Sequence, residues 1–261
     1  MKLPLFWVDA FSSQLFRGNP AAVVPLDRWP DDRLLQQIAF ENGLAETAFF
    51  VPAAADRHHL RWFTPKAEVD LCGHATVATA FTLFTQLGFG GSRLVFDSRS
   101  GPLVVQRLSD GRIELDFPAR PAVPMPPPPA LLQGLGAKPA HYAQAQANLA
   151  IFNTAAEVLA LQPDFAALAT LEQYGTIVTA PGTDCDFVSR FFAPRVGVPE
   201  DPVTGSAHCV LTPYWAQRLG RPRLHARQVS ARSGELWCEL AGDRVKIAGH
   251  ATLYLQGHIL V

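Results

Sequence analysis

Hydrophobic and polar positions in the first half of the chain predict a series of short strands and two helices. Apolar or alternating runs bounded by turn residues predict strands at residues 5–10, 21–24, 47–51, 59–63, 94–96, 103–107 and 113–117. Pro30 and Asp31 begin a helix that is apolar on one face and ends at Asn42-Gly43. Residues 75–87 are apolar on all sides, which predicts a central, buried helix with strands wrapped around it.

The second half of the chain repeats this pattern. Residues 205–220 (GSAHCVLTPYWAQRLG) match residues 73–88 (GHATVATAFTLFTQLG) in their first glycine and in their closing Leu-Gly. Shorter blocks recur in the same order: RWFTPK at 61–66 and RFFAPR at 190–195, RSG at 99–101 and 232–234, DGRI at 110–113 and GDRV at 242–245. A repeat of half the chain is far longer than the ~20–50 residues of a solenoid repeat. It therefore indicates two homologous domains.

We predict an α/β (α+β) fold of two duplicated domains, each a curved, mostly antiparallel sheet wrapped around a central helix. The N-terminal half spans residues 1–118 and the C-terminal half residues 130–261, and a proline-rich linker at 119–129 joins them, because such a run is extended and semi-rigid. The last strand, 252–261, has no counterpart before the linker and is a candidate to pair with the first domain. In the second central helix, Pro213 predicts a kink or an irregularity.

Composition narrows the class of protein. The 22 Lys and Arg residues nearly balance the 23 Asp and Glu residues, which gives no electrostatic basis for binding nucleic acid or an anionic membrane. No stretch approaches the ~20 apolar residues of a membrane span. The four cysteines show no CxxC spacing, so we expect free thiols and a cytoplasmic location.

The two glycine-led helix starts form the candidate site. A first helical turn leaves about four N–H groups without intrahelical partners, and these suit a carboxylate or phosphate. Gly73 and Gly205 lack a Cβ, so a ligand can approach the backbone closely. His74 and Ser206 occupy equivalent positions after them. The alternative is simple N-capping, because Thr204 and Ser206 are ordinary cap residues.

Two carboxylates have no counterpart in the other half. Glu46 follows the helix that ends at Gly43, where the second half has Ile177 and Val178. Its apolar neighbours would disfavour the ionised form and suit it to proton transfer, although an exposed Glu is the more common case. Asp201 precedes Gly205 and would hold the His74 imidazole in one tautomer, or would simply begin an Asp-Pro turn.

The motifs GNPAAVV, AETAFF, LCGHAT and EDPVTGSA, with the late Arg-Ser-Gly strand, resemble those of the phenazine-biosynthesis isomerase (PhzF-like) family. The resemblance covers nearly the whole chain in the same order. It implies a fold similar to that of diaminopimelate epimerase and proline racemase, with the active site between two domains. It also implies a homodimer and chemistry without a cofactor or metal.

The resemblance implies a role for each candidate residue. Glu46 is the general acid/base, and His74, Asp201 and Ser206 surround the substrate and assist proton movement. The substrate-binding residues are Asn19, Gly73, Thr204, Gly205 and Ser206. The implied reaction is an isomerisation by proton transfer on a small carboxylic acid, and neither the particular substrate nor a phenazine pathway follows from it.

Two other functions stay open at this point. The first is a cofactor-independent racemase or epimerase that uses Cys72, although such enzymes employ two cysteines and the position equivalent to Cys72 holds Thr204. The second is a binding protein without catalysis, which the full set of acid/base residues disfavours. A metal site is weaker still, because Cys72 and His74 lack convincing further ligands in the sequence.

Overall fold

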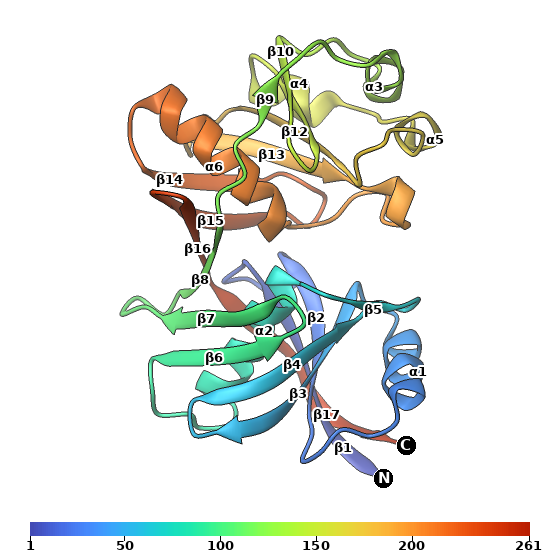
Figure 1. Cartoon of the computed structure of the whole chain (residues 1–261), viewed down its shortest axis with the longest axis vertical. Helices are drawn as coiled ribbons and strands as arrows, with labels where there is room; N and C mark the ends of the chain where they lie inside the picture. The colour runs from blue at the N-terminus through green and yellow to red at the C-terminus, as the bar shows by residue number, and fades with distance from the viewer. The chain divides into compact units, whose positions relative to one another are not determined.

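The computed structural model describes residues 1–261 and divides into two compact units. Unit 1 comprises Met1–Asp116 and Ala248–Val261, and unit 2 comprises Phe117–Ile247. The C-terminal strand therefore belongs to unit 1. Residues 119–129, which the sequence suggests as a linker, belong to unit 2 (Figure 1).

Unit 1 is a set of curved strands with two helices. Its elements are β1 (Lys2–Ala10), β2 (Asn19–Pro25), α1 (Asp32–Asn42), β3 (Glu46–Ala54), β4 (Arg57–Phe63), β5 (Glu68–Val69), α2 (Gly73–Thr85), β6 (Arg93–Ser98), β7 (Gly101–Arg107), β8 (Ile113–Pro118) and β17 (Ala251–Leu260). β1 pairs antiparallel with both β17 and β2, β2 runs parallel to β3, and β3 is antiparallel to β4. β4 then pairs antiparallel with β5 and parallel with β6, and β6, β7 and β8 follow as an antiparallel meander.

Helix α2 is buried on nearly every side, as its sequence predicts. Three of its threonines are fully buried, yet their hydroxyls need no partner outside the helix. Thr76, Thr79 and Thr82 each donate to the carbonyl four residues earlier, at 2.6, 2.8 and 2.9 Å. The helix thus presents an apolar surface to the strands that lie around it (Figure 1).

Unit 2 contains more short helices. Its elements are β9 (Val123–Pro124), α3 (Pro129–Leu135), β10 (His141–Gln144), β11 (Asn148–Ile151), α4 (Ala155–Ala160), α5 (Phe165–Leu168), β12 (Thr176–Pro181), β13 (Phe187–Phe192), the 3₁₀ turn η1 (Pro194–Val196), α6 (Gly205–Leu219), β14 (Arg223–Gln228), β15 (Gly234–Ala241) and β16 (Arg244–Gly249). β10 pairs antiparallel with β9 and β11, and β11 runs parallel to β12. β12 is antiparallel to β13, β13 parallel to β14, and β14 antiparallel to β15.

Helix α6 continues through Pro213 from Gly205 to Leu219. Proline has no N–H group, so the carbonyl of Cys209 lacks its usual helical donor. That carbonyl instead accepts the backbone N–H of Arg120 at 2.9 Å. The carbonyl that Pro213 leaves without a helical donor is therefore satisfied by Arg120 of the proline-rich segment. This hydrogen bond connects the segment to α6.

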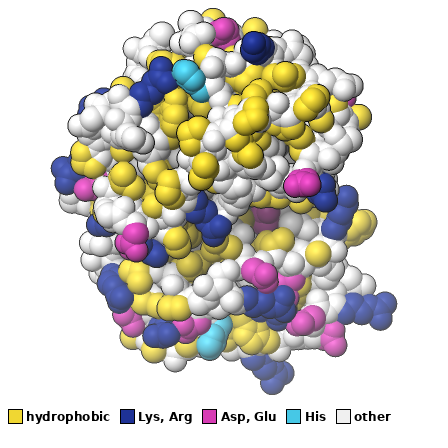
Figure 2. Space-filling view, turned by 45° about the horizontal axis from the view of Figure 1, so that its top comes forward, with side chains coloured by type: hydrophobic (Ala, Val, Ile, Leu, Met, Phe, Trp, Pro, Cys, Tyr) yellow, Lys and Arg dark blue, Asp and Glu magenta, His cyan; other side chains and the backbone are white.

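The charged side chains of the surface are of mixed sign. Lys and Arg side chains are interspersed with Asp and Glu on the face drawn in Figure 2. Several form ion pairs, such as Arg57 with Asp97 at 2.6 Å and Arg227 with Asp184 at 2.6 Å. None of the helices combines the length and the apolar composition that a membrane span requires.

The close packing of α2 predicts that it does not tolerate added volume. Ala78 is 0% exposed, so Ala78→Leu should cost about 1–3 kcal/mol of unfolding free energy. Ala166→Leu, on the exposed side of α5, is the control and should change stability by less than about 0.5 kcal/mol. Urea unfolding midpoints measure both, and equal midpoints for A78L and the wild type would show that α2 is loosely packed.

Candidate active site

The starts of α2 and α6 lack side-chain caps. The N-cap residues are Cys72 and Thr204, and neither side chain accepts a hydrogen bond from the first turn. In contrast, α1, α4 and α5 are capped by Asp31, Thr154 and Asp164. Thr204 therefore does not act as the ordinary cap that its residue type suggests. At the start of both buried helices, the first-turn N–H groups therefore receive no side-chain acceptor from the N-cap residue. Their partial positive charge suits an acceptor from elsewhere.

Glu46 and His74 lie together at the start of α2. Glu46 is the first residue of β3, and His74 lies in the first turn of the helix. The Glu46 carboxylate oxygen Oε2 is 3.1 Å from His74 Nε2, with side-chain exposures of 18% and 7%. Parallel pairing of β2 with β3, which sets Ala21 opposite Glu46, brings the beginnings of both strands to this end of the unit.

Asn19, the first residue of β2, holds the other side of the imidazole. Its Nδ2 lies 3.2 Å from His74 Nδ1. An amide N–H can only donate, so in this arrangement Nδ1 is the acceptor and Nε2 carries a proton toward Glu46. When His74 is doubly protonated, the Asn19 amide can present its oxygen to Nδ1 instead. Asn19 therefore fixes the ring orientation in both states.

Cys72 completes this cluster as a neutral thiol. Its Sγ lies 3.5 Å from His74 Nδ1. Burial, together with the charge of Glu46, raises the pKa of the Cys72 thiol to about 11. A thiol with this pKa is protonated at neutral pH and is a poor base or nucleophile.

The neighbours of His74 oppose the effect of burial on its pKa. Burial lowers the pKa of His74, but the charges and hydrogen bonds of Cys72 and Glu46 outweigh it and raise the pKa well above its usual value. Among the groups that raise it, Cys72 acts most strongly and the Glu46 carboxylate follows. The half-buried Glu46 therefore favours the charged form of the imidazole that it contacts.

The donor atoms of Glu46, Cys72 and His74 all lie within 4.8 Å of one another. In the sequence, Cys72 and His74 have no third metal ligand near them. In the structure, Glu46 lies close enough to be that third ligand. Carboxylate, thiolate and imidazole are ligands that suit Zn²⁺. Coordination would first require the Cys72 proton to leave.

A second cluster surrounds the start of α6 in unit 2. The Thr204 hydroxyl donates to Asp201 Oδ2 at 2.5 Å, and Ser206 Oγ lies 3.1 Å from the Tyr174 hydroxyl. Gln228, a buried residue that sequence reasoning did not identify, contacts both Asp201 and Thr204. The candidate residues therefore form two groups, one in each unit: Asn19, Glu46, Gly73 and His74 in unit 1, and Asp201, Thr204, Gly205 and Ser206 in unit 2.

An Arg–Glu pair anchors the segment that leads into each of these helices. Arg61 binds Glu68 through two parallel bonds of 2.7 and 2.8 Å, and Arg190 binds Glu200 through bonds of 2.8 and 3.0 Å. Each guanidinium also lies over the phenylalanine two positions later in the chain. Sequence reasoning matched the two Arg-containing blocks but missed their partners. The available signal was that Glu68 and Glu200 stand at the same distance before the two helix-start glycines.

Known proteins resemble the chain over its full length. The model of the phenazine biosynthesis-like protein family (PhzC-PhzF) matches residues 8–257. An uncharacterized isomerase of Pseudomonas aeruginosa is 54% identical over 260 residues, which cover 99% of each chain. The crystal structure of a PhzF-family phenazine biosynthesis protein from Enterococcus faecalis has a TM-score of 0.97 at 44% identity, over 100% of both chains. A probable proline racemase from Agrobacterium radiobacter shares the fold alone, with a TM-score of 0.66 at 12% identity, over 99% of this chain and 93% of that one.

The mixed α/β architecture and these matches define an isomerase with the epimerase-like fold. The chain belongs to the phenazine biosynthesis-like (PhzC-PhzF) family.

The charge of Glu46 predicts how His74 titrates. In Glu46→Gln the carboxylate is lost while the burial that lowers the pKa of His74 remains, so His74 should titrate at lower pH than in the wild type. NMR titration of the His74 ring protons, assigned with His74→Asn, measures this. Cys72→Ser is the comparison and should shift the His74 titration less than E46Q, because a neutral thiol contributes only its hydrogen bond to the imidazole. An unchanged His74 titration in E46Q would show that another group holds the imidazole charge.

Proposed function

We propose that the protein is a cofactor-independent isomerase that moves a proton on a small substrate bearing a carboxylate, with Glu46 as the general acid/base. The observation that carries this proposal is the 3.1 Å contact between Glu46 and the buried imidazole of His74 beside an uncapped helix start. A carboxylate paired with an imidazolium can accept a proton from carbon and return it to another carbon.

Each neighbouring group has a part in this reaction. The first-turn N–H groups that begin at Gly73 suit a substrate carboxylate, because their dipoles favour negative charge, and those that begin at Gly205 in unit 2 are equivalent. As Glu46 removes a proton, the charge that develops on the substrate is stabilised by these amides and by His74. Asn19 keeps the imidazole aligned for this role.

We propose that the unit 2 cluster also takes part in substrate binding. Asp201, Thr204 and Ser206 surround a helix start with the same lack of a cap as that of α2. Each uncapped helix start has a carboxylate close to it in its own unit, Glu46 at α2 and Asp201 at α6.

We also infer that the two units are copies of one fold. Both have an antiparallel hairpin (β1–β2 and β10–β11), then a parallel pair (β2–β3 and β11–β12), then an antiparallel pair (β3–β4 and β12–β13). In both, a parallel pair follows across the buried helix (β4–β6 and β13–β14). β17 beside β1 and β9 beside β10 are equivalent additions. We infer that β9 is the counterpart of β17, the last strand. The sequence alone did not reveal this counterpart.

The expectations of a homodimer, a cytoplasmic location and a carboxylic acid substrate stay predictions.

The proposal predicts that Glu46→Gln folds normally and loses proton transfer. A screen of small amino and hydroxy acids in D₂O, read by NMR, should show deuterium incorporation with the wild type. Glu46→Gln should lower the exchange rate of any active substrate by about 10²–10⁴-fold. Circular dichroism and the unfolding midpoint check that the variant is folded.

The same assay separates the other candidate functions. Cys72→Ser should retain exchange, since a thiol of pKa about 11 is not ionised at neutral pH. An active E46Q together with an inactive C72S would establish the racemase mechanism instead. Ligands that bind the wild type without any exchange would establish a binding protein.

A further inference from the structure

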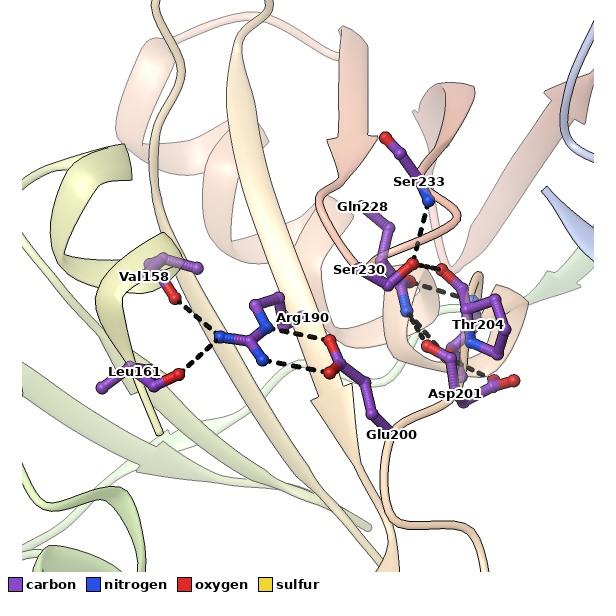
Figure 3. Close-up of polar contacts among 10 residues, drawn as sticks. Val158, Leu161, Arg190, Glu200, Asp201, Thr204, Gln228, Ser230 and Ser233 are labelled. Carbon is purple, nitrogen blue, oxygen red and sulfur yellow. Dashed lines mark hydrogen bonds and ion pairs between the residues drawn. The ribbon is translucent and has the colours of Figure 1, made fainter. Parts of the chain in front are cut away.

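Gln228, the last residue of β14, has its carboxamide inside the turn that precedes α6. It is 0% exposed. Its Oε1 accepts the backbone N–H of Thr204 at 2.9 Å. Its Nε2 donates to the Asp201 carbonyl at 2.7 Å and to the Thr204 hydroxyl oxygen at 3.2 Å. One buried side chain therefore contacts both ends of the segment from Asp201 to Thr204 (Figure 3).

These contacts leave only one orientation of the amide. The Thr204 backbone N–H can only donate, so the amide oxygen must face it. The Asp201 backbone carbonyl can only accept, so the amide NH₂ must face that side. The Thr204 hydroxyl lies on the NH₂ side and receives one of its protons. Two backbone groups thus fix which way the Gln228 amide points.

The amide in turn fixes the direction of the Thr204 hydroxyl proton. Because the hydroxyl oxygen accepts from Gln228, its own proton is directed to Asp201 Oδ2, 2.5 Å away. This separation is in the range of O–H···O⁻ hydrogen bonds, about 2.5–2.7 Å, in which the acceptor is ionised. Hydrogen bonds donated to a carboxylate favour its charged form.

We propose that Gln228 is a positioning residue: through the Thr204 hydroxyl, it holds the Asp201 side chain as an ionised hydrogen-bond acceptor at the start of α6. Its effect on catalysis rests on the proposed function, in which Asp201 faces the substrate. Its effect on the charge state of Asp201 does not depend on any reaction.

The segment has other anchors, so changing Gln228 should not release it. Arg190 binds Glu200 on one side through two bonds, and its third nitrogen donates to the carbonyls of Val158 and Leu161 at 3.1 and 3.0 Å. On the other side, Ser230 donates to the carbonyl of Pro202 at 2.8 Å. Ser230 touches neither the Asp201 nor the Thr204 side chain, which makes it a matched control (Figure 3).

The test is a ¹³C NMR titration of the Asp201 side-chain carboxyl, assigned with Asp201→Asn. Gln228→Met keeps the side-chain length and removes the NH₂ donor together with the oxygen that accepts the Thr204 N–H, and Thr204→Val keeps the shape and removes the hydroxyl. In both variants Asp201 should titrate at higher pH than in the wild type. The double variant should add little to the larger single shift, because both changes break the same chain of hydrogen bonds.

Two control variants should keep the wild-type titration. Thr204→Ser restores the hydroxyl, and Ser230→Ala loosens the same segment without touching the chain from Gln228 to Asp201. A Q228M protein that titrates like the wild type, or an S230A protein that shifts as far as Q228M, would overturn the proposal.

The deuterium-exchange assay then separates this inference from the proposed function. In Q228M, the acid limb of the pH–rate profile should move to higher pH, with kcat reduced by up to about 10²-fold and KM changed less. If the titrations behave as expected while the wild type exchanges no substrate, the role of Gln228 stands and the proposed isomerase function fails.

Discussion

The burial of α2 is the constraint from which the location of the candidate site follows. A helix that is apolar on all sides must be enclosed, and the threonines of α2 satisfy their own hydroxyls against the preceding turn. Enclosure leaves the two ends of the helix as the places where its polar groups can meet a ligand, and the N–H groups of the first turn are the ones that suit an anion. No side chain caps that turn. The strands of unit 1 then bring Asn19 and Glu46 to it, so the acid/base pair is positioned by packing that is mostly apolar.

Much of this arrangement can be predicted from the pattern of apolar residues, and some of it cannot. The sequence predicts a helix at 75–87 and the structure has Gly73–Thr85, because glycine is a poor helix former but is well tolerated at a helix start. Glu46 is identifiable from its apolar neighbours. Its 3.1 Å contact with His74 is not, since that distance depends on the parallel pairing of β2 with β3. The role of Gln228 cannot be predicted from the sequence pattern, because one polar residue at a strand end has no periodic signal. Its role follows from its hydrogen bonds with the Thr204 N–H and the Asp201 carbonyl.

The two N-cap positions differ in chemistry although they are alike in geometry. Cys72 and Thr204 both precede a helix-start glycine and leave the first turn uncapped. Burial keeps Cys72 a neutral thiol, with a pKa of about 11, so it fills space beside His74 without adding charge. Thr204 instead uses its hydroxyl to hold Asp201. A mechanism with two facing thiols would need reactive sulfur at both positions, whereas the geometry here favours carboxylates as the proton-transfer groups.

Binding and proton transfer are assigned to groups with different responses to pH. Backbone N–H groups do not titrate, so a substrate carboxylate held at the helix starts is held equally well over a wide range of pH. Proton transfer depends on groups that do titrate, and each of these has a neighbour that holds its charge state: Glu46 for His74, and the Thr204 hydroxyl, aligned by Gln228, for Asp201. In the proposed mechanism, the buried helices therefore supply affinity through their termini. The Glu46–His74 pair and the aligned Asp201 carboxylate would then decide when a bound substrate can react.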